Sequence, residues 1–211
     1  SALSRESYGG LIGGDIALGS ATLGAAVSYS DTDVDVDPAS LGVGSVQTLN
    51  VLAYADIDLG GPVIRAGGGY GWSTVETNRS VSFGTFSDNL SADYDGTTLY
   101  GFAELGYNFD LGGGYLEPFL GLTLIEADTD AFAESGSSAA LTVDGVSDNS
   151  TIATAGARFG WSLSDTVSLG GRAGWQHGFG DLTPRSIASF DTGSAFTTRG
   201  TSQSADAGFI Q

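Results

Sequence analysis

The 211 residues predict an all-β fold: an antiparallel up-and-down transmembrane β-barrel that forms a single unit over residues 1–211. Apolar and polar residues alternate along about eight segments, which indicates strands with one apolar face. Short turns alternate strictly with long polar connections, and aromatic residues lie at two levels on the apolar faces. Membrane-spanning barrels combine these three features, because lipid surrounds one face of their strands and their two ends carry loops of unequal length.

The clearest element is a hairpin predicted over residues 97–125. Every second residue from Leu99 to Phe109 shares one face, and every second residue from Leu116 to Leu124 shares one apolar face after the glycine turn at 112–114. A period of two places alternate side chains on opposite faces of a strand, and a short turn joins two such strands into a hairpin. We interpret its apolar face as facing lipid.

The same alternation predicts further strands on both sides of this hairpin. They cover residues 8–18, 21–29, 49–57, 64–72, 153–163 and 167–175, with a cut-off strand at 205–211. Short turns are expected near Gly19, Gly60, Gly113 and Asp165. Residues 1–7 are polar without a period, and long loops are expected at 31–46, 73–96, 127–150 and 178–204. A soluble sandwich has no reason for this regularity, since its connections cross between sheets in several ways.

The composition excludes several classes of function. The chain carries 25 acidic and 7 basic residues, all of the latter Arg, for a net charge of −18. This balance argues against a nucleic-acid partner, because phosphate binding needs clustered positive charge. The lack of Cys excludes disulfides and thiolate metal sites. No apolar run approaches the roughly 20 residues of a membrane helix.

Aromatic side chains on the apolar faces lie at two levels that bracket a band of Leu, Val, Ala and Gly. This is the girdle pattern of a membrane barrel. The level near the long loops comprises Tyr29, Tyr70, Trp72 and Trp175. The level near the short turns comprises Tyr107, Phe109, Phe159 and Trp161.

Isolated charges lie on the opposite faces of the same strands. A charge on the lipid face costs about 2–4 kcal/mol at the bilayer midplane for Arg or Lys, so we expect these side chains to point into the lumen. They fit either a catalytic carboxylate pair with neighbouring cations or a lumen charge network that keeps the pore hydrated, and we favour the network. The expected members are Arg65, Glu104, Glu117, Arg158 and Arg172.

The sequence predicts no catalytic residue, metal site or cofactor. A Ser-His-Asp triad or a histidine metal site would require His177, the one histidine, which lies beside Trp175 where a strand meets a long loop. We interpret His177 as an interfacial residue. The acidic run at residues 31–37 does not fit an EF-hand, because Val36 and Gly42 occupy the positions that require Gly and Glu. Weak binding of divalent cations by this run stays a hypothesis.

Several longer fragments carry a resemblance to a known family. They are GGDIALG at 13–19, PVIRAGGGYGWS at 62–73, LEPFLGL at 116–122, GWQHGFGDLTP at 174–184 and GSAFTTRG at 193–200. In combination, these fragments resemble the translocator barrel of bacterial autotransporters, the proteins of type V secretion.

This resemblance implies a barrel of twelve strands whose lumen is threaded by a helix or linker. It also implies a passenger domain of the same polypeptide, insertion by the barrel-assembly machinery, and contact with outer-membrane lipid and lipopolysaccharide. Roughly eight full strands and a stub are present, starting at the family's second strand and stopping about two and a half strands early. We therefore expect a chain that is incomplete at both ends rather than a naturally small barrel.

The predicted function is that of a translocator barrel in the bacterial cell outer membrane, which anchors and exports a passenger and is not an enzyme. The alternative is a small self-contained outer-membrane barrel that acts as an adhesin or structural anchor. A soluble secreted β-protein is disfavoured, because a passenger solenoid would show short repeats whereas this chain has unequal loops and two aromatic levels.

Overall fold

The computed structural model describes residues 3–36, 42–164, 166–180, 183–191 and 193–211. Within these ranges the chain forms strands, and none of it forms a helix that is long and apolar enough to cross a membrane. The strands are β1 (Leu3–Leu18), β2 (Ala21–Val36), β3 (Gly42–Asp58), β4 (Pro62–Phe83), β5 (Phe86–Tyr107), β6 (Phe109–Asp110), β7 (Gly114–Thr129), β8 (Phe132–Ala133), β9 (Leu141–Val143), β10 (Val146–Ser164), β11 (Val167–Gly180), β12 (Arg185–Phe190), β13 (Phe196–Arg199) and β14 (Asp206–Ile210).

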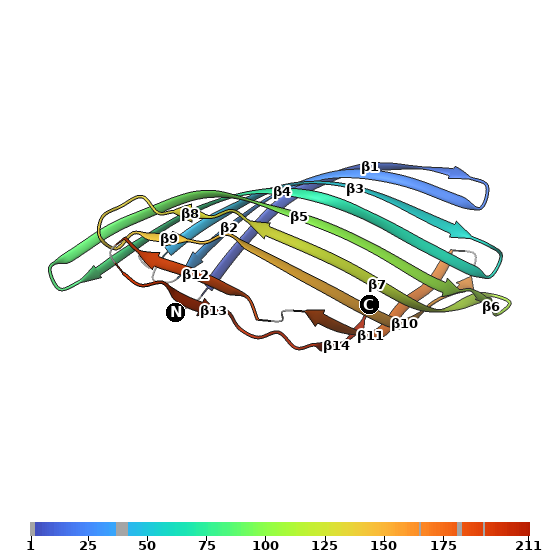
Figure 1. Cartoon of the computed structure of the whole chain (residues 1–211). Helices are drawn as coiled ribbons and strands as arrows, with labels where there is room; N and C mark the ends of the chain where they lie inside the picture. The colour runs from blue at the N-terminus through green and yellow to red at the C-terminus, as the bar shows by residue number, and fades with distance from the viewer. Residues whose placement is uncertain (1–2, 37–41, 165, 181–182, 192) are drawn as a thin grey trace.

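The main sheet follows the chain in order, β1-β2-β3-β4-β5-β7-β10-β11-β14, with the short β6 paired to β7. Every neighbouring pair is antiparallel, which confirms the predicted all-β up-and-down fold. Eight of these strands are long and β14 has 5 residues, so the expected eight strands and a stub are also confirmed. Figure 1 shows the sheet as a long arch whose edge strands are β1 and β14. Closure into a barrel stays a prediction.

The short turns gather at one end of the arch (Figure 1). Gly19, Gly60 and Gly112 adopt φ angles of 65°, 79° and 70°, a left-handed conformation that favours glycine. The side chains of Asp58 and Asp110 each accept a hydrogen bond of 2.8 Å from the backbone N–H two residues ahead, at Gly60 and Gly112. These contacts confirm three of the four predicted turns, while Asp165 of the fourth lies outside the described residues.

The predicted long loops are largely wrong, because the strands continue through them. β1 already begins at Leu3, which pairs with Val36 at the end of β2, so the acidic residues 31–35 lie in a strand. β4 and β5 remain paired up to Phe83 and Phe86, with a tight turn between them. Beyond the apolar band lipid no longer requires an apolar residue at every second position, so the sequence loses its period although the backbone ladder continues.

Two of the predicted loops contribute to a second sheet of four strands in the order β13-β12-β9-β8. Thr129 of β7 pairs with Val146 of β10, and Phe132 of β8 pairs with Val143 of β9. The two paired segments each advance by three residues between these pairs, so β8 and β9 keep the register of β7 and β10. β12 pairs with β9 as β11 pairs with β10. The second sheet therefore prolongs the last strands of the main sheet beyond the apolar band.

The two faces of the main sheet differ in exposure. Along β7 the side chains alternate, so that Leu120 is 66% exposed whereas Glu117 is 2% exposed. We call the face of Leu120 the outer face and the face of Glu117 the inner face. Large apolar side chains line the outer face, which in a water-soluble protein would be an unusually large exposed apolar surface.

Glycines make room for rings on the inner face. A Cβ atom at Gly156 would lie 2.8 Å from Cζ of Phe119, and one at Gly69 would overlap the hydroxyl of Tyr100. The same relation holds between Gly67 and the ring of Phe102. The high glycine content thus has a packing role, because each of these rings rests on the backbone of the neighbouring strand.

Candidate functional site

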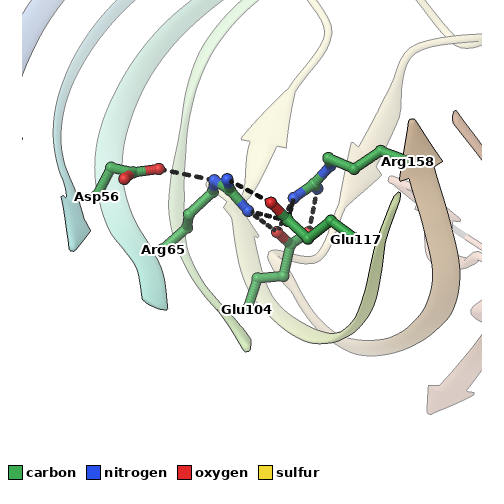
Figure 2. A network of polar contacts seen from close by, with 5 residues as sticks. All are labelled: Asp56, Arg65, Glu104, Glu117 and Arg158. Carbon is green, nitrogen blue, oxygen red and sulfur yellow. Dashed lines mark hydrogen bonds and ion pairs between the residues drawn. The ribbon is translucent and has the colours of Figure 1, made fainter. Parts of the chain in front are cut away.

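Four charged side chains from adjacent strands meet on the inner face. Arg65 on β4 pairs in register with Glu104 on β5, and Glu117 on β7 pairs with Arg158 on β10. Nη1 of Arg65 lies 2.6 Å from Oε1 of Glu117 and 3.1 Å from Oε1 of Glu104. Nη1 and Nη2 of Arg158 each donate a bond of 2.7 Å to Glu104. Figure 2 shows the two guanidinium groups and the two carboxylates pointing toward one another.

Glu117 is the centre of this cluster, which we call the charge network. Its side chain is 3% exposed and accepts bonds from both Arg65 and Arg158, whose side chains are 29% and 17% exposed. A buried carboxylate is stable only when such partners compensate for its lost hydration. In the described part of the chain, every buried side-chain nitrogen or oxygen has a hydrogen-bond partner.

The charge network joins four strands through oppositely charged side chains that neutralise one another. Each carboxylate binds both arginines, so neither acid stands free to exchange a proton with a substrate. Gly106 admits the Glu117 side chain, since a Cβ atom there would lie 2.7 Å from Oε1 of Glu117. This arrangement offers a fixed pattern of positive and negative charges on an otherwise aromatic and glycine-rich surface.

Arg172, the fifth expected member, is not part of the cluster. It pairs in register with Arg158, and its guanidinium lies over the ring of Phe209 on β14, with Cζ 5.1 Å from the ring centre. No ion pair of Arg172 is found among the described residues. Arg158 makes a similar contact with Phe119, at 4.3 Å.

The predicted girdle residues lie on the outer face. Seven of the eight are between 41% and 48% exposed, and Tyr70 is half-buried against Trp72, with ring centres 4.8 Å apart. Near the short turns, the rings of Tyr107 and Phe109 lie 4.7 Å apart. Their role in holding the chain at the two membrane interfaces stays a prediction.

Sequence reasoning missed Asp56, whose Oδ2 lies 2.7 Å from Nε of Arg65 (Figure 2). The alternation of residues 49–57 already places Asp56 on the face opposite the apolar one, so this alternation alone could have identified Asp56 as an inner-face charge. It also missed Asp206, which accepts bonds from Nδ1 of His177 at 2.8 Å and Nε1 of Trp175 at 3.1 Å. No local pattern links these residues, because the pairing of β14 with β11 brings them together.

The acidic run is a strand with its carboxylates on one face. Asp31, Asp33 and Asp35 alternate along β2, and Asp31 accepts a bond of 2.9 Å from the hydroxyl of Tyr8. That contact raises the pKa of Tyr8. Asp37 lies outside the described residues. Among the residues that the structure covers, no group of three His, Cys, Asp or Glu side chains is placed to hold a metal ion.

A comparison with family models and curated proteins finds clear relatives. A model described as the autotransporter beta-domain matches residues 1–211. Two proteins of Serratia marcescens, each named extracellular serine protease, are 34% and 32% identical over 205 and 211 residues, or 92% of this chain. The chain covers 19% of each of them, and so spans about a fifth of their length.

Solved structures share the fold. The translocator domain of autotransporter NalP from Neisseria meningitidis matches with a TM-score of 0.69 at 17% identity, over 99% of this chain and 79% of that one. The transport unit of autotransporter AIDA-I from Escherichia coli matches with a TM-score of 0.54 at 14% identity, over 99% of this chain and 70% of that one.

Proposed function

The chain belongs to the autotransporter beta-domain family of outer-membrane translocators, and we propose that its inner face lines the lumen through which a passenger domain of the same polypeptide is exported. Residues 1–211 act as one unit in this proposal. The observation that carries it is the segregation of the two faces. Exposed leucines and aromatic rings cover the outer face, whereas the charge network lies on the inner face.

The charge network has two roles in this proposal. It holds β4, β5, β7 and β10 together through bonds between fixed charges, and it keeps the inner surface wetted so that an extended chain can slide past. In this proposal, the protease activity in the names of the Serratia proteins resides in the parts of those longer polypeptides that this chain does not cover. The 211 residues themselves export and anchor, and they need no catalytic residue, cofactor or metal ion for this role.

The outer face meets lipid between the two aromatic levels. Above Trp72, the outer faces of β4 and β5 carry Glu76 and Asp93, which are paired in register. This acidic zone lies at the level of the lipopolysaccharide head groups, and the barrel-assembly machinery inserts the strands. The family match supports these partners, and the exposed leucines support the lipid contact.

Two neighbouring residues of β7 test the proposal. Thr123→Cys places a thiol on the inner face and Leu122→Cys places one on the outer face, in a chain whose 211 residues contain no other thiol. In intact cells that express the full polypeptide, a small water-soluble maleimide is expected to label Thr123→Cys and to spare Leu122→Cys, which lipid covers. Equal labelling of both positions would contradict a water-filled inner face.

A further inference from the structure

The connection between β7 and β10 folds onto the inner face of the long β4–β5 hairpin. Ser91 of β5 and Ser135 exchange both of their backbone hydrogen bonds, at 3.1 and 2.7 Å. The rings of Tyr94 and Phe132 stack in parallel, with their centres 4.1 Å apart. Gly136 lies directly on Leu90, which is 2% exposed. The connection is therefore packed against the hairpin at several points.

Two charged groups of the hairpin hold this connection. Arg79 donates hydrogen bonds from Nε and Nη2 to the two carboxylate oxygens of Glu134, and a further one of 3.0 Å from Nη2 to the carbonyl of Ala139. Asp88, which is 8% exposed, accepts bonds from the hydroxyl of Ser137 at 2.7 Å and from the backbone N–H of Ser137 and Ala139. We call these contacts the latch. The arginine–carboxylate pair is bidentate, the strongest common form of such a bond.

The latch lies on the lumen side of the wall. The pairing of β4 with β5 is free of register shifts from Pro62 to Phe83, so alternation places Arg79 on the same face as Arg65. By the same rule Asp88 lies on the face of Glu104. Arg79 is seven residues beyond Trp72, roughly 23 Å along the strand, and so stands beyond the apolar band at the end opposite the short turns.

We propose that residues 136–139 form a strap that narrows the outer opening of the lumen, and that Arg79 and Asp88 hold it closed. This inference rests on the proposed function, since it takes the inner face for the lumen. When a polypeptide passes, the latch bonds break and the strap moves aside on β8 and β9. When the lumen is empty, the bonds form again and cover Leu90.

A thiol at Leu90 reports the state of the strap. The full polypeptide is expressed with Leu90→Cys, and intact cells are treated with a membrane-impermeant maleimide. Thr85→Cys, at the exposed tip of the hairpin, is the reference for an outward-facing and uncovered thiol. The chain without either substitution is the blank, because its 211 residues hold no Cys.

Thr85→Cys is expected to react fast and Leu90→Cys slowly. Adding Arg79→Ala to Leu90→Cys is expected to raise the labelling rate at least about tenfold, because the loss of even one hydrogen bond between charged groups has an effect of that size and Arg79 donates three bonds. Arg185→Ala, which removes an exposed arginine of β12, is the matched control and leaves the rate unchanged. Heat-modifiable migration in gels verifies that each variant has assembled, and Glu134→Gln replaces Arg79→Ala if that variant does not.

Either of two results would contradict the proposed strap. One is a Leu90→Cys rate equal to that of Thr85→Cys without any other substitution, and the other is a rate that loss of the latch leaves unchanged. If Thr85→Cys is labelled only after cell lysis, the outward orientation is wrong. In that case the proposed function itself fails, and the strap fails with it.

Discussion

At the scale of single residues, Glu117 shows how this chain holds a charged side chain that is almost completely shielded from water. Its side chain is 3% exposed and lies between two guanidinium groups that also bind Glu104. Breaking one side of such a buried arrangement leaves uncompensated charge, which costs more than the bonds themselves contribute. The charge network is therefore sensitive to loss of any one member, and most sensitive to loss of its centre.

Glu117→Ala is expected to lower the free energy of unfolding by about 3 kcal/mol, because it removes the more buried of the two carboxylates that neutralise Arg65 and Arg158. Urea unfolding of the protein in phospholipid vesicles, followed by tryptophan fluorescence, measures this change. Glu76→Ala on the exposed outer face of β4 is the control and is expected to change the free energy by less than about 0.5 kcal/mol. Equal effects of the two substitutions would show that the network adds no stability.

At the scale of elements, the inner-face rings and the glycines opposite them decide how closely neighbouring strands pack. Gly156 on β10 is the clearest case, since a Cβ atom there would lie 2.6 Å from the carbonyl oxygen of Ala173 and 2.8 Å from the ring of Phe119. Both β11 and β7 would have to shift. A methyl group at Gly14 on β1 would meet nothing within 4 Å.

Gly156→Ala is expected to destabilise the fold by about 1–3 kcal/mol, the usual effect of forcing extra volume into a packed site. Gly14→Ala is expected to be neutral or slightly stabilising, because it only restricts the unfolded chain. The temperature at which heat-modifiable migration is lost ranks the two variants against the unmodified protein. A ranking in which Gly14→Ala is the less stable variant would contradict this packing role.

The latch is expected to respond to acid. Hydrogen bonding to the Ser137 hydroxyl holds the pKa of Asp88 below its ordinary value of 3.8, so protonation favours the open strap. The contribution of Asp88 to closure is complete at neutral pH and is lost as the pH falls through that lowered pKa. Hydrogen exchange at residues 136–139, corrected for the intrinsic rate, is therefore expected to increase at low pH.

Asp88→Asn supplies the control for this experiment. An amide cannot titrate, so exchange in the variant is expected to be faster at neutral pH and to lose the part of its acid dependence that Asp88 supplies. Asp206 has a pKa lowered by its bond to His177, but it lies on β14 and does not contact the strap. An acid response that persists in Asp88→Asn would assign the titration to another group.

The sequence predicts the strands of the apolar band well and the elements above it poorly, for a physical reason. Leu99 and Leu120 lie in a period of two because lipid demands an apolar residue at every second position. No such demand applies beyond Trp72, so residues 73–96 and 127–150 look like loops although they are mostly paired strands.

The charge network was also predictable from the alternation of side chains along each strand. Four of its five expected members are in contact, and Asp56 follows the same rule. Arg172 does not join them because the residue paired with it on the adjacent strand is Arg158, which carries a like charge. The ring of Phe209 offers Arg172 an alternative partner. The latch and the bond between His177 and Asp206 join segments distant in sequence, and a single sequence holds no signal for them.

At the scale of the whole molecule, one sheet separates two solvents. Its outer face exposes leucines between two aromatic levels, and its inner face carries charges that are bonded to one another. A large apolar surface on a folded chain calls for a partner, and the family assignment identifies that partner as the lipid of the outer membrane. The direction of each side chain then decides which substitutions the protein tolerates.

Arginine placed at neighbouring positions of β7 makes this dependence measurable. Leu122→Arg directs the charge into lipid and is expected to destabilise the folded protein by about 2–4 kcal/mol near the bilayer midplane. Thr123→Arg directs it to the inner face, where water solvates it, and the expected loss is below about 1 kcal/mol. Urea unfolding in vesicles gives both values. The two positions are adjacent in sequence and share the strand, its depth and its two neighbouring strands, so the chief difference between them is the environment that each face meets. Equal losses at both positions would mean that the two faces of the sheet meet the same environment.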